Sequence, residues 1–329
     1  GRGGIPRRTQ HRTETEGTIR MEAQTSATVK TRPAKRKRRS LYRSEMRWGY
    51  LFIAPPFIGV FVFLLYPLLN SLYMSLTNFN FGQPAEFIGL DNYKRALADD
   101  PLVWKTLWNT FYAALGVPLG MIAALFAALL LDRKLRGRHF FRMLFFLPTI
   151  CSVVALAMVW RWIFNADFGL LNYYLGVIGI DAPAWLIDQT WAMPAMIIQG
   201  VWGGLGVSII LYLAALGNVP TSLYEAATVD GANGWQKFIH ITVPGISPVT
   251  FFILITSLIG ALQDFPRFQL LTGGGPNYST TTIVYYLYTV AFQYSEMGYA
   301  SALAWILGII IMLIIVINFV FSKRWVHYN

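Results

Sequence analysis

Six long apolar stretches constrain the fold of this chain more than any other feature. A helix of about 20 residues is needed to cross roughly 30 Å of hydrocarbon, and an unpaired backbone group in lipid costs several kcal/mol. The chain is 55% hydrophobic and 13% charged, whereas about a quarter of the residues of a soluble protein are charged. We therefore expect an all-α membrane protein with six transmembrane helices. The stretches are residues 51–76, 107–131, 141–164, 191–216, 246–265 and 299–321.

Proline residues interrupt the first three of these stretches. Proline removes a backbone donor and crowds the preceding turn, so it kinks or ends a helix. We expect kinks or helix ends at Pro55, Pro56, Pro67, Pro118 and Pro148. The spans are therefore predicted to form an irregular bundle.

The first 48 residues have a different character from the rest of the chain. They are polar and basic, with the run KRKRR at residues 35–39, and they contain no apolar stretch. Such a segment buries too little apolar surface to fold, so residues 1–48 are predicted to be a disordered cytoplasmic tail and residues 49–329 the membrane domain. A basic run can bind nucleic acid or anionic lipid, but we expect it to fix the orientation in the lipid bilayer and to bind no nucleic acid.

The distribution of cations predicts the orientation. Placing the amino terminus in the cytoplasm puts most of the 27 Lys and Arg residues on the inner side, as the positive-inside rule requires. An even number of spans then places both termini, and the polar loop at residues 220–245, in the cytoplasm.

The loop at residues 220–245 is predicted to contain two short helices. Ser222 and Glu225 have the spacing of a capping box, so the first helix should begin at Ser222. Asp230 and Gly231 should then reverse the chain, because glycine accepts a positive φ. Asn233 or Ala232 can open the second helix. On the outer side, residues 168–180 and 283–292 are apolar but too short to cross, so we expect short interfacial helices there.

This loop resembles the EAA loop of ABC importer permeases. Glu225-Ala226-Ala227 is followed at the family's spacing by Gly231, by Ile241 and by Val243-Pro244, where the family has Leu-Pro. Four other segments resemble the permeases of carbohydrate ABC importers that serve maltose, lactose and glycerol phosphate. They are WRWIFNADFGLLN (160–172), VWGGLG (201–206), LTGGGP (271–276) and GYASALAW (298–305).

The resemblance implies a multi-subunit importer in a bacterial or archaeal cytoplasmic membrane. Its partners would be ATP-binding subunits, a second related permease and an extracellular or periplasmic solute-binding protein that delivers a sugar or related solute. ATP and Mg would be bound by the partner ATPase, since this chain has no Gly-Lys-Ser/Thr motif and is expected to bind no cofactor and to be no enzyme. The residues implied in ATPase coupling are Glu225, Ala226, Ala227, Asp230, Gly231 and Lys237.

Two helix faces are candidates for the solute pathway. One carries small residues at helical spacing, which equally fits close helix packing. The other carries Asp264, an acid that would face a cavity or pair with Arg267. A carboxylate can accept sugar hydroxyls and repels phosphate, which favours a neutral sugar. The pathway residues are Gly200, Gly203, Gly204 and Val207 on the first face, and Ser257, Ala261 and Asp264 on the second.

A self-sufficient ion-coupled transporter or channel is the alternative. Ion coupling usually requires acids buried at mid-membrane and repeated halves, whereas this sequence offers only an off-centre Asp264 and no evident repeat. The four histidines are scattered, so neither a metal site nor a catalytic group is predicted.

Overall fold

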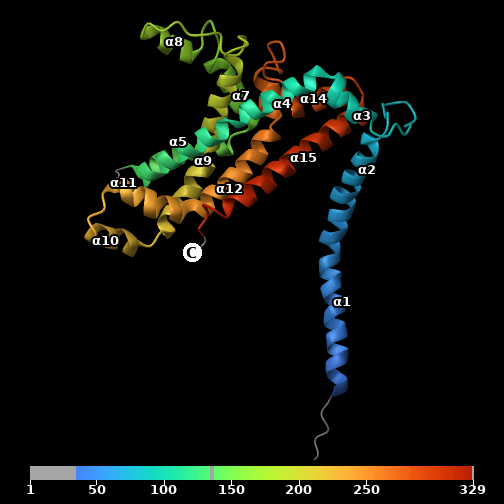
Figure 1. Ribbon diagram of the computed structural model, residues 1–329, viewed down its shortest axis with the longest axis horizontal. Coiled ribbons are helices and arrows are strands. Elements are labelled where there is room, and N and C mark those ends of the chain that lie inside the picture. Colours follow the sequence, from blue (N-terminus) through green and yellow to red (C-terminus); the bar gives the residue numbers. More distant parts are fainter. Residues whose placement is uncertain (1–34, 134–136, 328–329) are drawn as a thin grey trace, which may run out of the picture. The chain divides into compact units, whose positions relative to one another are not determined.

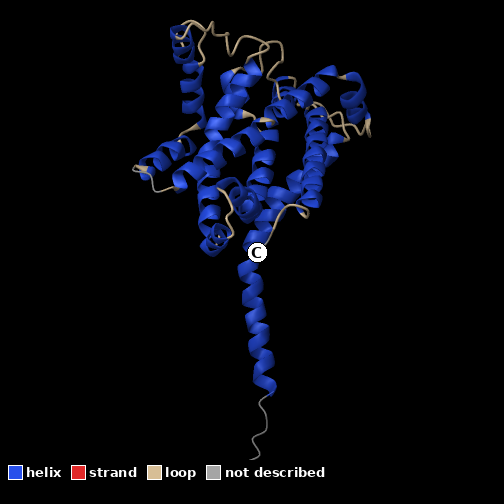
Figure 2. Ribbon diagram, turned by 60° about the vertical axis from the view of Figure 1, so that its left-hand side comes forward, coloured by secondary structure: helices blue, strands red, loops and turns tan. Residues whose placement is uncertain are grey.

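The computed structural model describes residues 35–133 and 137–327. Within those ranges the chain is helical, and the only β-type contact is an isolated antiparallel bridge between Thr77 and Phe87 (Figure 2). The chain divides into two units, Gly1–Leu64 and Leu65–Asn329, which we describe separately.

The first unit contains α1 (Lys35–Val60), which runs into the π-helical segment η1 (Phe61–Leu65). Residues 35–48 of the predicted tail belong to α1, and the disorder of the tail stays a prediction. Lys and Arg are good helix formers, and a helix already nucleated in an apolar stretch extends at little cost. Residues 1–34 of the predicted tail lie outside the described residues. Pro55 and Pro56 lie within α1 and do not end it.

Within residues 35–133 and 137–327, five helices are long and apolar enough to cross a membrane. They are Trp48–Ser75, Pro101–Asp132, Ala192–Asn218, Gly234–Leu262 and Met297–Ser322. The first ends in α2 (Tyr66–Ser75). The second comprises α4 (Pro101–Ala114) and α5 (Gly116–Asp132), the third is α9 (Ala192–Asn218), and the last is α15 (Met297–Ser322). These five match predicted spans.

The remaining predicted span, residues 141–164, is a bent pair. Helices α6 (Arg138–Ile150) and α7 (Val153–Ile163) are long enough to cross a membrane only when taken together, and the angle between them is 106°. Cys151 and Ser152 between them have extended backbone angles, and Pro148 cannot donate to the preceding turn. The expected kink or helix end at Pro148 is confirmed, and the number of spans is six only if the pair counts as one.

Helix α9 is central to the second unit. Helices α5, α6 and α12 (Val243–Leu262) pack against it, and α2 packs against α15 (Figure 1). Alanines on α5 let the backbones approach closely. The shared core of α5, α9 and α12 includes Ala124, Ala128, Ile209, Tyr212 and Ile253.

Short helices close both ends of the second unit. In Figure 1, α10 (Thr221–Val229) and α11 (Gly234–Lys237) lie at one end, while α3 (Asp91–Lys94), α8 (Leu170–Val177) and α14 (Ile283–Tyr288) lie at the other. Two of these match the predicted short apolar pieces. The π-helical segments η2 (Arg95–Asp99) and η4 (Thr289–Gln293) follow α3 and α14, and α13 (Pro266–Leu271) follows α12.

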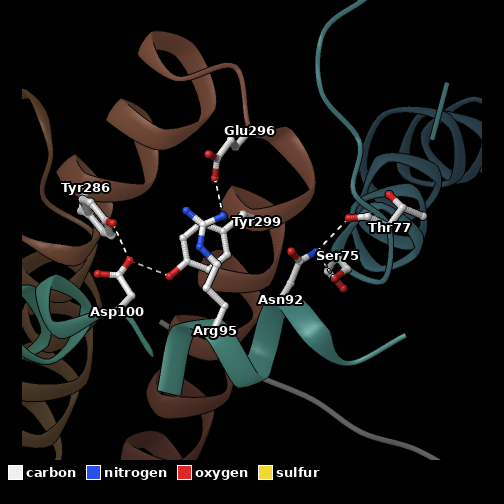
Figure 3. Close-up of polar contacts among 8 residues, drawn as sticks. All are labelled: Ser75, Thr77, Asn92, Arg95, Asp100, Tyr286, Glu296 and Tyr299. Carbon is white, nitrogen blue, oxygen red and sulfur yellow. Dashed lines mark hydrogen bonds and ion pairs between the residues drawn. The ribbon is translucent and has the colours of Figure 1, made fainter. Parts of the chain in front are cut away.

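A polar cluster joins the start of α4 to α14 and α15 (Figure 3). Asp100 caps α4 by accepting a hydrogen bond from the backbone N–H of Leu102 at 3.0 Å, and its other carboxylate oxygen accepts the phenols of Tyr286 at 2.5 Å and Tyr299 at 2.7 Å. Burial raises the pKa of the Tyr286 phenol, and its hydrogen bond to Asp100 raises it further. The phenol therefore stays protonated and remains a donor.

A second part of this cluster joins α15 to the segment after α2. Arg95 pairs with Glu296 at 2.7 Å and lies over the ring of Tyr299. Asn92 donates to the backbone carbonyls of Ser75 and Thr77 at 2.9 and 2.8 Å (Figure 3). These contacts tie the end of α2 to the short helices that lead into α4.

We predict that Asp100→Ala lowers the free energy of unfolding by about 2 to 4 kcal/mol, because it removes a helix cap and leaves two buried phenols without an acceptor. Thermal unfolding in detergent would show a lower Tm. Asp91→Ala is the control, since it removes only an exposed pair with Lys94. Equal Tm losses in the two variants would contradict the assignment.

Candidate functional site

The predicted two-helix loop is present and is bent at Gly231. Helix α10 ends at Val229, Gly231 has a φ of +79°, and α11 begins at Gly234 and continues through η3 (Phe238–Thr242) into α12. Asn233 caps α11 with a reciprocal capping box, in which Asn233 and Gln236 exchange hydrogen bonds at 2.9 and 2.8 Å.

The capping box predicted at Ser222 and Glu225 is wrong. Helix α10 begins at Thr221 with Pro220 in the cap position, and no side chain caps it. Pro220 fixes its own φ near the value at which a helix can start, so the helix begins one residue earlier than the Ser222 signal indicates. Ser222 therefore lies inside the first turn.

Two side-chain contacts hold α10 against α11 and η3, the helical segments that lead into α12. The Tyr224 phenol and the buried Thr242 hydroxyl are 2.9 Å apart. Lys237 donates to the Thr228 hydroxyl at 2.9 Å, and that hydroxyl donates to the Tyr224 carbonyl at 2.6 Å. The loop is therefore tied to the span that follows it.

The other predicted coupling residues lie on the outside of the loop. Glu225, Ala226, Asp230 and Gly231 are exposed, while Ala227 and Lys237 are half-buried. The same loop exposes large apolar side chains, with Val229 88% and Trp235 68% exposed. An exposed apolar surface of this kind, bordered by charges, is typical of a protein interaction site.

A cavity of about 460 Å³ lies between α4, α5, α9, α12 and the break between α6 and α7. Its volume is in the range of small-molecule sites. Six of the seven predicted pathway residues line it, and Val207 does not. They are Gly200, Gly203, Gly204, Ser257, Ala261 and Asp264.

The glycine face on α9 is open at Gly203 and Gly204, whereas a Cβ at Gly200 would overlap the Arg267 guanidinium. A Cβ at Gly204 would meet nothing within 4 Å, and one at Gly203 would reach only the Gln199 side chain. The close approach between helices occurs instead at Gly206, where a Cβ would lie 2.6 Å from the Phe145 carbonyl oxygen of α6. Small residues at 203 and 204 therefore shape the cavity.

Asp264 both lines the cavity and pairs with Arg267. The Arg267 Nε lies 2.6 Å from Asp264 Oδ2, and the two side chains are 15% and 21% exposed. This pair was predicted as one alternative for Asp264. Arg267, Gln199 and Ser208 also line the cavity, which was not predicted. Gln199 and Ser208 lie beside the glycine face on α9. Their helical spacing from these glycines could therefore have indicated that they line the same cavity.

The described residues contain no group of three or more His, Cys, Asp or Glu side chains that could hold a metal ion. The free Cys151 lies at the α6–α7 break and lines the cavity. The site therefore offers a solute-sized space with hydroxyl, amide and charged groups on its wall.

The family and the curated relatives agree on one class. Residues 116–327 match the model of the "binding-protein-dependent transport system inner membrane component" family. A probable ABC transporter permease protein, YesP of Bacillus subtilis (strain 168), is 41% identical over 90% of this chain and 96% of its own length. The lactose transport system permease protein LacF of Rhizobium radiobacter is 38% identical over 82% and 91% of the two chains.

Solved structures show the same fold. One chain of a bacterial ABC transporter involved in the import of the acidic polysaccharide alginate is 26% identical, with a TM-score of 0.73 over 87% of this chain and 99% of that chain. A chain of a bacterial alginate ABC transporter, in complex with alginate pentasaccharide-bound periplasmic protein, has a TM-score of 0.75 at 24% identity, over 87% and 96% of the two chains.

The fold and the cavity thus define a helical membrane protein with a solute-sized internal space. The chain belongs to the family of inner membrane components of binding-protein-dependent transport systems.

We predict that Tyr224→Phe loosens α10, because it removes the hydrogen bond to Thr242, a loss of about 1 kcal/mol. Hydrogen–deuterium exchange should become faster in residues 221–229 and stay unchanged in α15. Tyr173→Phe, at an exposed position on α8, is the matched control and should alter neither region. Unchanged exchange in α10 of the Tyr224 variant would show that this bond does not hold the helix.

Proposed function

We propose that this chain is the permease subunit of an ABC importer that carries a sugar or related solute across the cytoplasmic membrane, driven by a separate ATPase. One observation carries the proposal beyond family membership. The loop that exposes Glu225 continues directly into the Gly234–Leu262 helix, and that helix contributes Ser257 and Ala261 to the cavity. A displacement of the loop is therefore passed along one helix to the solute space.

The proposed partners are ATP-binding subunits, a second related permease and an extracellular or periplasmic solute-binding protein. The relatives' names support this assembly, since they include permease proteins for lactose, arabinooligosaccharides and sn-glycerol 3-phosphate. We place both termini in the cytoplasm of a bacterial or archaeal cell. This orientation puts the loop at residues 220–245 on the same side of the membrane as the ATPase and its ATP. The cation distribution supports the same orientation.

The chain itself supplies no chemistry in this proposal. ATP and Mg bind the partner ATPase, and closure of the ATPase pair moves the exposed surface of α10. The contacts of Tyr224 and Lys237 transmit that movement to η3 and α12. The rearranged walls of the cavity then open toward the side where the binding protein delivers solute.

An ion-coupled carrier is the competing function. A proton-coupled carrier needs an acid that gains and loses a proton during transport. Asp264 lies 2.6 Å from Arg267 Nε, so this acid already has a counter-charge inside the protein. This pairing supports the ATP-driven function over the carrier.

Glu225→Lys tests the proposal. Reversing the charge of this exposed loop residue should reduce solute uptake at least about tenfold, since a mismatched charge at an interface costs on the order of 1 to 2 kcal/mol or more. Uptake in cells and the ATPase activity of the purified complex are both measured at equal expression. Glu45→Lys, the same change at an exposed position outside the loop, should have little effect.

The competing function predicts a different result. Full uptake by the Glu225→Lys variant, or uptake by the lone chain in vesicles that carry only an ion gradient, would contradict the ATP-driven function.

A further inference from the structure

Residues 323–327 fold back from the end of α15 onto the start of α12. Helix α15 ends at Ser322, at the same end of the second unit as α10 and α11 (Figure 1). The backbone N–H of Trp325 donates to the Ser322 carbonyl at 3.1 Å, which turns the chain. The N–H of His327 then donates to the Ser247 hydroxyl on α12 at 3.0 Å. We call residues 323–327 the clasp.

Ser247 lies where the backbone of α12 lacks a donor. Pro248 follows it inside the helix, and proline has no N–H to donate to the carbonyl four residues earlier, which belongs to Pro244. The Ser247 hydroxyl donates to that carbonyl at 2.7 Å. Because Ser247 is 2% exposed, bulk water does not replace either of its partners. One buried hydroxyl therefore joins the clasp to Pro244, at the end of the loop at residues 220–245.

Aromatic rings add an apolar contact between the clasp and α12. The buried Phe251 of α12 has its ring centre 5.1 Å from that of Phe319 in α15 and 6.0 Å from that of Trp325 in the clasp. Both pairs are edge-to-face, an arrangement that stabilises aromatic contacts at these separations. The clasp thus holds the beginning of α12 by a hydrogen bond and by packing.

The two ends of the loop meet beside this contact. Val219, which follows α9, is buried. A Cβ built at Gly245 would lie 2.9 Å from the Val219 Cγ2 atom, which is closer than side chains normally approach. The glycine therefore lets the start of α12 pass close to the end of α9, and the first turn of α12 contacts both that end and the clasp.

Helices α12 and α15 are also attached to each other far from the loop. Leu262 of α12 and Leu303 and Leu307 of α15 belong to one buried core. A single attachment would let one helix pivot against the other. The clasp provides a second attachment at the loop end, and two separated attachments hold the pair as one body.

We propose that the clasp makes α15 move together with α12 when the loop at residues 220–245 is displaced, and that Ser247 is the positioning residue of this connection. The proposal rests on the proposed function, in which an ATPase displaces the loop. A displacement at Pro244 reaches Ser247 through its hydrogen bond, and it reaches α15 through His327 and the aromatic rings. The movement therefore passes to two membrane spans.

Two pairs of variants test the hydrogen bonds of the clasp. Ser247→Ala removes the hydroxyl, whereas Ser247→Thr keeps it. His327→Pro removes the N–H, whereas His327→Ala keeps the N–H and, like the proline variant, removes the imidazole. Hydrogen–deuterium exchange is measured on the detergent-purified complex of permease and ATPase subunits.

The amides of Trp325 and Val326 should exchange about fivefold faster in Ser247→Ala and in His327→Pro, as expected for the loss of one hydrogen bond. Ser247→Thr and His327→Ala should exchange at nearly the natural rate. The double variant Ser247→Ala/His327→Pro should exchange no faster than either single variant, because both changes remove the same bond. Unchanged exchange in the two disruptive variants, or additive effects in the double variant, would overturn the clasp.

Spin labels test the shared movement. Val243→Cys and Val320→Cys place labels at exposed positions near the loop ends of α12 and α15, and Cys151→Ser removes the free thiol. Pulsed EPR compares the distance between the two labels in the nucleotide-free complex and in the complex trapped with ATP and vanadate. The distance should be the same in both states with His327→Ala and should change on trapping with His327→Pro.

Ser247→Ala should repeat the result of His327→Pro, which separates the loss of the hydrogen bond from the effect of a proline ring. A distance that changes on trapping when His327 is native, or that stays constant in both disruptive variants, would overturn the proposal. Recovery of the chain without an ATPase would instead contradict the proposed function alone, since the exchange measurement on that chain still decides whether the clasp forms.

Discussion

The close packing of α5 and α12 on α9 is the interaction on which the second unit depends. In a membrane the hydrophobic effect does not drive helices together, so association relies on close contact and on small residues that permit it. Ala124 and Ala128 supply that contact from α5, and Gly206 lets α9 approach α6. Where α9 instead carries Gly203 and Gly204 with nothing against them, the cavity appears between the same helices. The same glycine-rich helix therefore makes close helix contacts at one position and forms part of the cavity wall at others.

The same scaffold connects the two sites. The apolar helix Gly234–Leu262 begins in the exposed loop and ends two residues before Asp264. The contacts of Tyr224 and Thr228 in α10 with Thr242 and Lys237 fix the loop to this helix. At its other end the Asp264–Arg267 pair and the Met196 carbonyl link α12, α13 and α9. The loop is therefore connected to the cavity by hydrogen bonds and a continuous backbone.

Sequence reasoning reached the features that depend on local chemistry. Apolar length identified the spans, and Asp230-Gly231 identified the turn, because only a few residues accept its backbone geometry. It misplaced the features that depend on competition between neighbours. Two capping signals occur in the loop. Asn233 and Gln236 do form a capping box at the start of α11, whereas Ser222 and Glu225 do not form one at the start of α10. The basic run at residues 35–39 favours disorder by composition, yet it forms the first turns of α1, a helix that continues into the apolar residues that follow.

Three-dimensional contacts account for the rest. Pro148 indicated a break, but a proline alone does not specify the 106° angle between α6 and α7. Likewise, the sequence shows that Asp264 and Arg267 are close in the chain. The space beside α9 that the Arg267 guanidinium occupies exists because residue 200, distant in the chain, is a glycine. A glycine face read from spacing alone fits packing and cavity equally well, and only the neighbouring helices decide between them.

The most direct test of the central claim is to purify this protein from native membranes in mild detergent and to identify the accompanying chains by mass spectrometry. An ATPase subunit together with a second permease, with a solute-binding protein recovered after mild cross-linking, is the predicted result. A stable protein recovered alone, able to move solute in vesicles with an ion gradient and no ATP, would contradict the account.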